Sequence, residues 1–153
     1  MELEIEHRFP PTPDSVAAAR RSLGRLAGHV PEPLLSDLRL LVSELVTNSV
    51  RHARLGSKDV IELRVALSGD SVRLEVADPG PGFEATLRPP GPDGSSGWGL
   101  HVVDAIADRW GVDHRDSTRV WVEINRPSEP RKRPPGNRPG ALSLLSCCAF
   151  LTT

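Results

Sequence analysis

The sequence predicts a two-layer α/β (α+β) sandwich, in which three helices cover one face of a mixed, mostly antiparallel sheet. Short segments in which apolar and polar residues alternate are typical of strands that bury one face. Other segments carry apolar residues at helical spacing and need a surface on which to pack. Helices and strands do not alternate regularly along the chain, which excludes a doubly wound fold.

The predicted elements all lie within residues 1–126. Prolines at Pro13 and Pro31 mark the starts of two helices, because proline is tolerated in the first turn. Alternating apolar residues mark the strands, beginning with Leu3, Ile5, His7 and Phe9. In chain order we expect a strand at 3–9, helices at 13–28 and 31–54, strands at 61–67 and 72–76, a helix at 99–110, and a strand at 120–124.

The composition excludes several classes of protein. The 153 residues carry 19 basic and 20 acidic side chains, whereas a protein that coats nucleic acid needs a strong basic excess. No apolar run approaches the roughly 20 residues that span a membrane, and the acidic N-terminus is unlike a signal peptide. The adjacent Cys147 and Cys148 cannot form a disulfide framework or a zinc site alone. We therefore expect a cytoplasmic protein that binds no nucleic acid directly and no membrane.

Residues 127–153 differ in composition from the rest of the chain. They contain five prolines, and four basic residues against one acidic residue, without apolar periodicity. Such a segment buries too little apolar surface to offset the entropy of ordering it. We expect a folded domain over residues 1–126, followed by a Pro-rich, basic and disordered tail.

The helix predicted at 31–54 carries polar residues beside its apolar arc. Glu44 and Asn48 lie four positions apart and share one stripe of the helix. Arg51 extends this stripe by one turn, and His52 lies at its margin. The stripe is either a solvated helix face or one wall of a binding site.

The strand predicted at 72–76 is followed by Asp78 and by the glycines Gly80 and Gly82. Asp78 has the parity of the strand's apolar residues, so its carboxylate is directed toward the helices, where a charge is costly without a partner. The glycines allow a ligand to approach the backbone closely. The same residues also suit a simple turn.

A glycine-rich segment, residues 94–100, precedes the third predicted helix. Gly97 and Gly99 leave the N–H groups of a helix N-terminus accessible, which favours an anion such as phosphate. A cap formed by Ser95 or Ser96 explains the pattern equally well. The sequence contains no Walker-type phosphate loop, no G-x-S-x-G motif and no histidine spacing typical of metal sites.

Together, these motifs resemble those of the Bergerat-fold (GHKL) ATPases, the group that includes gyrase and the histidine kinases. Residues 44–53 are similar to the N box of the group, residues 78–83 to its first glycine box, and residues 97–100 to its second. The resemblance covers residues 1–126. Within the group, the short chain most resembles bacterial anti-sigma factors of the serine/threonine-kinase type.

The resemblance implies a role for each matching residue. Asp78 would accept a hydrogen bond from the adenine amino group of ATP, with Thr118 supporting that end of the pocket, and Asn48 would coordinate Mg²⁺. Glu44 would be the catalytic general base that takes a proton from the attacking hydroxyl. Residues 83–96 would form a lid over the nucleotide. The other implied nucleotide-binding residues are Arg51, His52, Gly80, Gly82, Gly97, Gly99 and Leu100.

The resemblance also implies partners and a regulatory role. Such a kinase would hold a sigma factor inactive, phosphorylate a small anti-anti-sigma (STAS-type) antagonist and act as a homodimer, with its partner surface on the first two helices. Two other functions stay open: an ATP-responsive binding module that transfers no phosphate, and a detached sensor-kinase domain that phosphorylates histidine. Ser49 and Trp98 depart from the residues common in the group, and we expect both changes to leave nucleotide binding intact.

Overall fold

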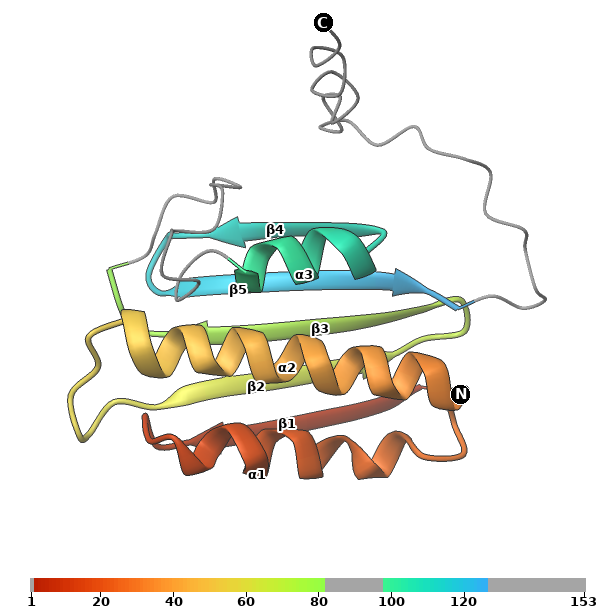
Figure 1. Cartoon of the computed structure of the whole chain (residues 1–153), viewed down its shortest axis with the longest axis horizontal. Coiled ribbons are helices and arrows are strands. Elements are labelled where there is room, and N and C mark those ends of the chain that lie inside the picture. Colours follow the sequence, from red (N-terminus) through yellow and green to blue (C-terminus); the bar gives the residue numbers. More distant parts are fainter. Residues whose placement is uncertain (1, 82–97, 127–153) are drawn as a thin grey trace, which may run out of the picture.

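The computed structural model describes residues 2–81 and 98–126, within which five strands form one sheet (Figure 1). The strands are β1 (Leu3–Phe9), β2 (Ile61–Leu67), β3 (Ser71–Asp78), β4 (Arg109–Asp113) and β5 (Thr118–Asn125). Their order across the sheet is β1-β2-β3-β5-β4, so β5 lies between β3 and β4. All neighbouring strands in the described residues are antiparallel, which confirms the mostly antiparallel sheet and leaves no parallel pair among them.

Three α-helices in the described residues lie on the same face of the sheet (Figure 1). They are α1 (Asp14–Ser22), α2 (Glu32–His52) and α3 (Trp98–Ile106), and a short 3₁₀ helix, η1 (Leu23–Leu26), follows α1. The predicted two-layer sandwich is therefore confirmed. None of the helices in this part of the chain is long and apolar enough to cross a lipid bilayer.

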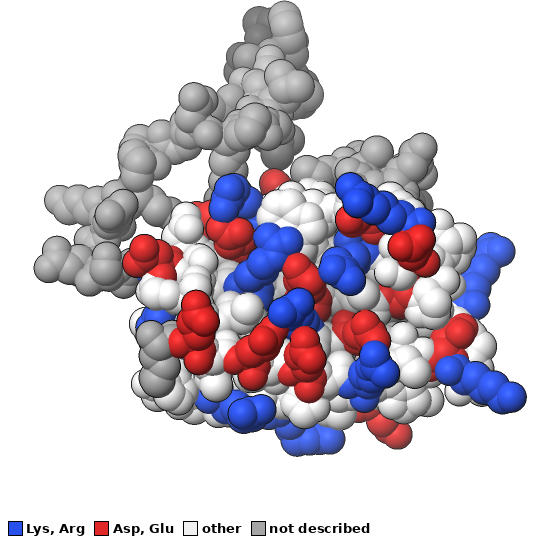
Figure 2. All heavy atoms as spheres, turned by 180° about the vertical axis from the view of Figure 1, so that it is seen from behind, with Lys and Arg blue, Asp and Glu red and all other residues white. Residues whose placement is uncertain are grey.

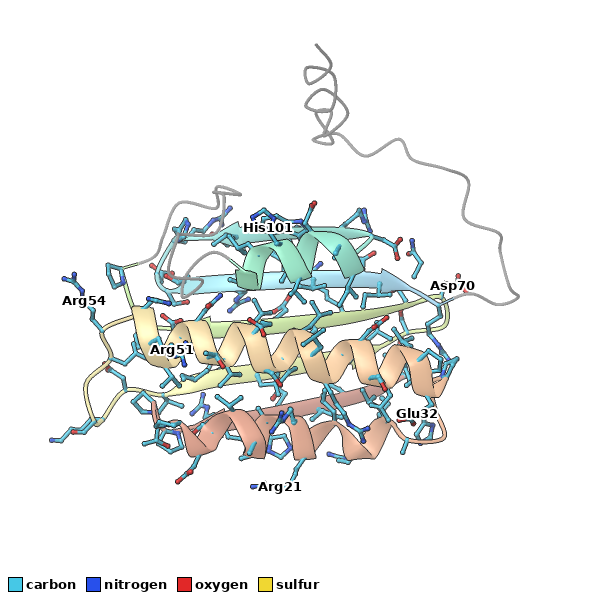
Figure 3. All side chains as sticks on the ribbon, viewed as in Figure 1. Arg21, Glu32, Arg51, Arg54, Asp70 and His101 are labelled. Atoms are coloured by element: carbon cyan, nitrogen blue, oxygen red, sulfur yellow. The ribbon has the colours of Figure 1, made fainter. Side chains whose placement is uncertain are left out.

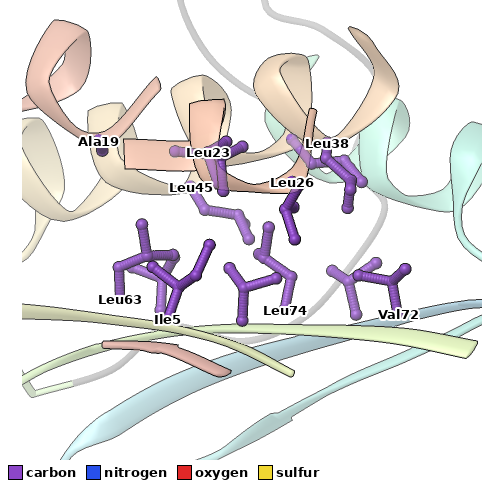
Figure 4. Packing of buried hydrophobic residues seen from close by; sticks show 14 of the residues in the cluster. Ile5, Ala19, Leu23, Leu26, Leu38, Leu45, Leu63, Val72 and Leu74 are labelled. Atoms are coloured by element: carbon purple, nitrogen blue, oxygen red, sulfur yellow. The ribbon is translucent and has the colours of Figure 1, made fainter. Parts of the chain in front are cut away.

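The core fills the space between the helices and the sheet (Figure 4). Leu38 and Leu45 on α2 are buried because they fall on its apolar arc. Leu63 and Leu74 meet them from β2 and β3, where successive side chains point to opposite faces of the sheet. The two periodicities read from the sequence thus converge on one hydrophobic layer.

The C-terminal ends of α1 and α3 differ from the prediction. The first helix, expected to reach Gly28, ends at Ser22 and continues as η1. The third helix ends at Ile106, so Trp110, expected within it, belongs to β4. The expectation of a helix over 107–110 was wrong because β4 is short and only partly buried, and it therefore carries no clear alternation.

The face of the sheet opposite the helices is open, and basic and acidic side chains alternate over it (Figure 2). Arg73 pairs with Glu75 at 2.7 Å and with Glu123 at 3.6 Å, and its guanidinium stacks over Trp121. Near the sheet edge, the hydrogen bond and charge of Glu4 raise the pKa of Arg64 above its ordinary value. The arginine side chains on this face are more exposed than those of Glu75 and Glu123, which are only 15% and 16% exposed.

Candidate functional site

The centre of the site is the carboxylate of Asp78, the last residue of β3. Only 6% of Asp78 is exposed, as the strand parity predicted. Its Oδ1 accepts a hydrogen bond from the backbone N–H of Gly80 at 2.9 Å, and its Oδ2 accepts one from the hydroxyl of Ser49 at 2.6 Å. Both donors are uncharged, and no ion pair among the described residues involves Asp78. The carboxylate is therefore a buried, oriented acceptor.

Thr118 and Gly80 complete this end of the sheet. Thr118 is the first residue of β5, lies opposite Asp78 in the β3–β5 register and is 4% exposed. Its hydroxyl donates a hydrogen bond to the carbonyl of Gly80 at 3.1 Å. Gly80 is thus held through its N–H by Asp78 and through its carbonyl by Thr118, which fixes the backbone where the chain leaves β3.

Glycine is required at position 80 by the close approach of α2. A Cβ at Gly80 would lie 2.8 Å from the Cβ and the carbonyl oxygen of Ala53, and 2.8 Å from Oδ1 of Asp78. These neighbours are backbone or short side-chain atoms that cannot move aside. At Gly80 the structure thus shows the tight turn that was one of the two interpretations of these glycines.

A second close approach joins α2 to the start of α3. A Cβ at Gly99 would lie 2.8 Å from Nδ2 of Asn48, so the first turn of α3 packs against the Asn48 amide. Gly99 and Leu100 are both buried. The first N–H groups of a helix have no partner inside it and carry its positive dipole end. The structure therefore brings a helix N-terminus beside the side-chain amide of Asn48.

The polar stripe of α2, which was predicted from the sequence, runs from Glu44 through Asn48 to the C-terminal end of the helix. Glu44 and Asn48 are half-buried, whereas Arg51 and His52 are exposed at the C-terminal end of α2, where Figure 3 labels Arg51. Glu44 lies one turn before Asn48. The guanidinium of Arg51 adds positive charge at this helix end.

The structure brings together most of the residues singled out in the sequence. Hydrogen bonds join Asp78, Gly80 and Thr118 in one group, and a close approach joins Asn48 and Gly99 in a second. Leu100 follows in the first turn of α3, and Glu44, Arg51 and His52 belong to the same α2. Gly82, Gly97, the capping candidates Ser95 and Ser96, and the proposed lid at 83–96 lie outside the described residues, as does the tail at 127–153.

Two site residues were missed by the sequence reasoning. Ala53 contacts the Gly80 turn, and Ser49 donates to Asp78. Ser49 carried a usable signal, because it lies four positions after Leu45 and therefore on the apolar arc of α2. A hydroxyl at such a position needs a buried partner.

The described residues contain no group of three or more histidine, cysteine, aspartate or glutamate side chains that could enclose a metal ion. A cation at this site would depend on Asn48 together with oxygen atoms supplied by a ligand. This arrangement suits Mg²⁺, which is commonly bound by few protein ligands plus substrate phosphates.

This fold and this cluster define an ATPase-type domain, and comparison with known proteins gives the family. Residues 9–125 match the model of the histidine kinase-like ATPase domain, so the chain belongs to that family. A solved relative, the histidine kinase domain from the Erythrobacter litoralis EL346 blue-light activated histidine kinase, shares the fold with a TM-score of 0.50 and 23% identity. That match covers 76% of this chain and 61% of the solved chain.

Among sequence relatives, the serine-protein kinase RsbW of Listeria monocytogenes is 32% identical over 91 residues, which is 58% of each protein. The serine-protein kinase RsbW of Bacillus subtilis is 27% identical over 130 residues, 76% of this chain and 81% of that protein. The uncharacterized protein SCO4941 of Streptomyces coelicolor is 38% identical over 82 residues, 52% of this chain and 75% of that protein.

Proposed function

We propose that this chain binds ATP with Mg²⁺ between α2, the end of β3 and the start of α3. The observation that carries the proposal is the buried Asp78 carboxylate, whose two oxygens accept hydrogen bonds from two neutral donors. An adenine amino group is a donor that suits such an acceptor, since hydrogen bonds to charged groups are the stronger ones. The Gly80 turn beside it packs tightly against Ala53 and the Asp78 carboxylate.

The opposite end of the site suits the phosphates. The N-terminus of α3 provides N–H donors and a positive dipole end for anions. Asn48, packed against Gly99, offers a neutral oxygen ligand to Mg²⁺. Arg51 adds positive charge at the end of α2, and His52 lies next to it as a further proposed nucleotide-binding residue. Gly82 and Gly97 complete the proposed nucleotide-binding set, with residues 83–96 as the lid.

We further propose that the domain is a serine/threonine protein kinase. Bound ATP supplies the γ-phosphoryl group, and Mg²⁺ neutralises charge on the phosphates. Glu44 is the proposed general base, because it lies one helical turn before Asn48 and so faces the same side of α2. The similarity to the RsbW serine-protein kinases supports this assignment.

The proposed biological role is that of a cytoplasmic anti-sigma factor that regulates transcription by partner switching. The chain would bind a sigma factor and release the sigma factor when an anti-anti-sigma protein of STAS type takes its place. The chain would also phosphorylate this anti-anti-sigma protein. The exposed surfaces of α1 and α2 are the proposed docking face, and a homodimer is the proposed active unit. The folded domain is proposed to span residues 1–126, with residues 127–153 as a disordered tail.

The test combines a binding measurement with a transfer assay. Calorimetry with ATP, with and without Mg²⁺, should show binding that Mg²⁺ tightens. Incubation with labelled ATP-Mg²⁺ and the STAS-type proteins encoded nearby should label a serine or threonine of one of them. Binding without transfer to any candidate would instead identify an ATP-responsive regulatory module, and label on histidine would identify a sensor-kinase domain. Absence of ATP binding would overturn the proposal as a whole.

A further inference from the structure

Among the buried residues of α2, which the structure describes in full, Ser49 alone has a polar side chain. Only 6% of Ser49 is exposed. A serine inside a helix ordinarily donates its hydroxyl to the carbonyl four residues earlier. Ser43, on the same helix, does so with the Arg39 carbonyl at 2.7 Å. Ser49 instead donates across the layer to Oδ2 of Asp78 at 2.6 Å, so this hydroxyl joins α2 to the end of β3.

The two hydrogen bonds to Asp78 restrict its carboxylate in different ways. The Gly80 N–H is only two residues away, and it fixes one oxygen relative to the local turn. The Ser49 hydroxyl comes from a separate element, 29 residues away in sequence, and it fixes the second oxygen. With both oxygens fixed, the plane of the carboxylate is fixed, and so are the directions of its remaining lone pairs.

We propose that Ser49 is a positioning residue that sets the preference of this site for a 6-aminopurine nucleotide. This inference rests on the proposed ATP binding and deepens it. A purine 6-amino group donates to a correctly oriented carboxylate, whereas a 6-oxo group presents lone pairs that the carboxylate repels. Without the Ser49 hydroxyl, the Asp78 carboxylate loses its fixed plane, so the advantage of the amino group decreases.

The test measures the preference itself in the full chain. ATP is compared with the triphosphate of purine riboside, which has hydrogen in place of the 6-amino group. In Ser49→Ala, the dissociation constant of ATP should rise about 3- to 10-fold, because an oriented hydrogen bond to a charged group is weakened. The dissociation constant of the analogue should change less than about twofold, since it makes no such bond.

Ser43→Ala is the matched control. It is the same substitution on the same helix, but the hydroxyl that it removes bonds within α2 and does not reach Asp78. The Ser43→Ala variant should prefer ATP over the analogue as strongly as the native chain does. A loss of preference in both variants would show a general effect on α2 and would overturn the proposal.

The outcomes separate this inference from the proposed function. A native chain that binds neither ATP nor the analogue refutes the proposed function and, with it, the role of Ser49. A native chain that binds ATP and the analogue equally well refutes the preference, and so the role of Ser49, but not ATP binding. A native preference that Ser49→Ala leaves unchanged refutes only the role of Ser49. Circular dichroism checks the fold of each variant. If Ser49→Ala does not fold, Ser49→Cys replaces it: the thiol is a weaker donor, so a reduced preference supports the proposal and a native preference overturns it.

Discussion

Replacement of Asp78 by asparagine tests the centre of the site, because it preserves shape while removing the charge. The amide oxygen of the new side chain can still accept from the Gly80 N–H, but its NH₂ group then faces the hydroxyl of Ser49. The hydroxyl must turn to accept, and the group that would face adenine is no longer a charged acceptor. We expect the fold to persist, because both neighbouring hydrogen-bonding groups keep a partner.

The expected effect on binding follows from the type of bond that is lost. A hydrogen bond to a charged group contributes about 1.5–3 kcal/mol, so the affinity for ATP should fall by roughly 10- to 150-fold. GTP should bind the native chain poorly, because its 6-oxo group meets the carboxylate, and the difference between the two nucleotides should narrow in Asp78→Asn. Isothermal titration with both nucleotides measures these changes.

Asp70→Asn is the control for this prediction. Asp70 lies in the turn that precedes β3, at the opposite end of that strand from Asp78, and it is exposed (Figure 3). Because Asp70 lies far from the proposed adenine site, Asp70→Asn should leave the affinities for ATP and for GTP unaltered. Equal affinities of the native chain for ATP and GTP, or an Asp78→Asn variant that binds ATP as tightly as the native chain, would refute the adenine assignment.

Four further predictions concern the rest of the site and the chain. Glu44→Gln should lower phosphoryl transfer by about 10²–10⁴-fold while ATP affinity changes by less than about 1 kcal/mol, in paired transfer and binding assays; a matched loss of binding would make Glu44 part of the nucleotide site. Asn48→Ala should abolish the Mg²⁺-dependent tightening of ATP binding with an unchanged circular dichroism spectrum, and an unfolded variant would show a structural role instead. Gly80→Ala should destabilise the fold by about 1–3 kcal/mol in urea denaturation because of its contacts with Ala53, whereas Gly69→Ala, with no atom within 4 Å of its added Cβ, should not; equal stabilities would contradict the close approach. Deletion of residues 127–153 should leave the melting temperature and the ATP affinity unchanged, and a large decrease in melting temperature would move the domain boundary.

Local patterns in the sequence were sufficient to predict most of the elements. Alternation identified β1, β2, β3 and β5, and helical spacing identified α2 over nearly its whole length. These patterns work because each element buries one face, so its own residues report its geometry. β4 escaped prediction because it is a short edge strand of partly exposed residues. Its Gly111, which lacks a side chain, leaves room for the ring of Trp121 on β5.

The sequence by itself determined that Asp78 points into the helical layer, because strand parity is a local property. The side chains proposed to bind a nucleotide stay a prediction. Only the tertiary structure decided which groups meet there. It joined Ser49 to Asp78, Thr118 to Gly80, and Asn48 to Gly99. These contacts connect positions far apart in the chain, and they depend on the insertion of β5 beside β3 and on the packing of α2 against α3. No local pattern specifies such pairings, since they follow from how complete elements share one core.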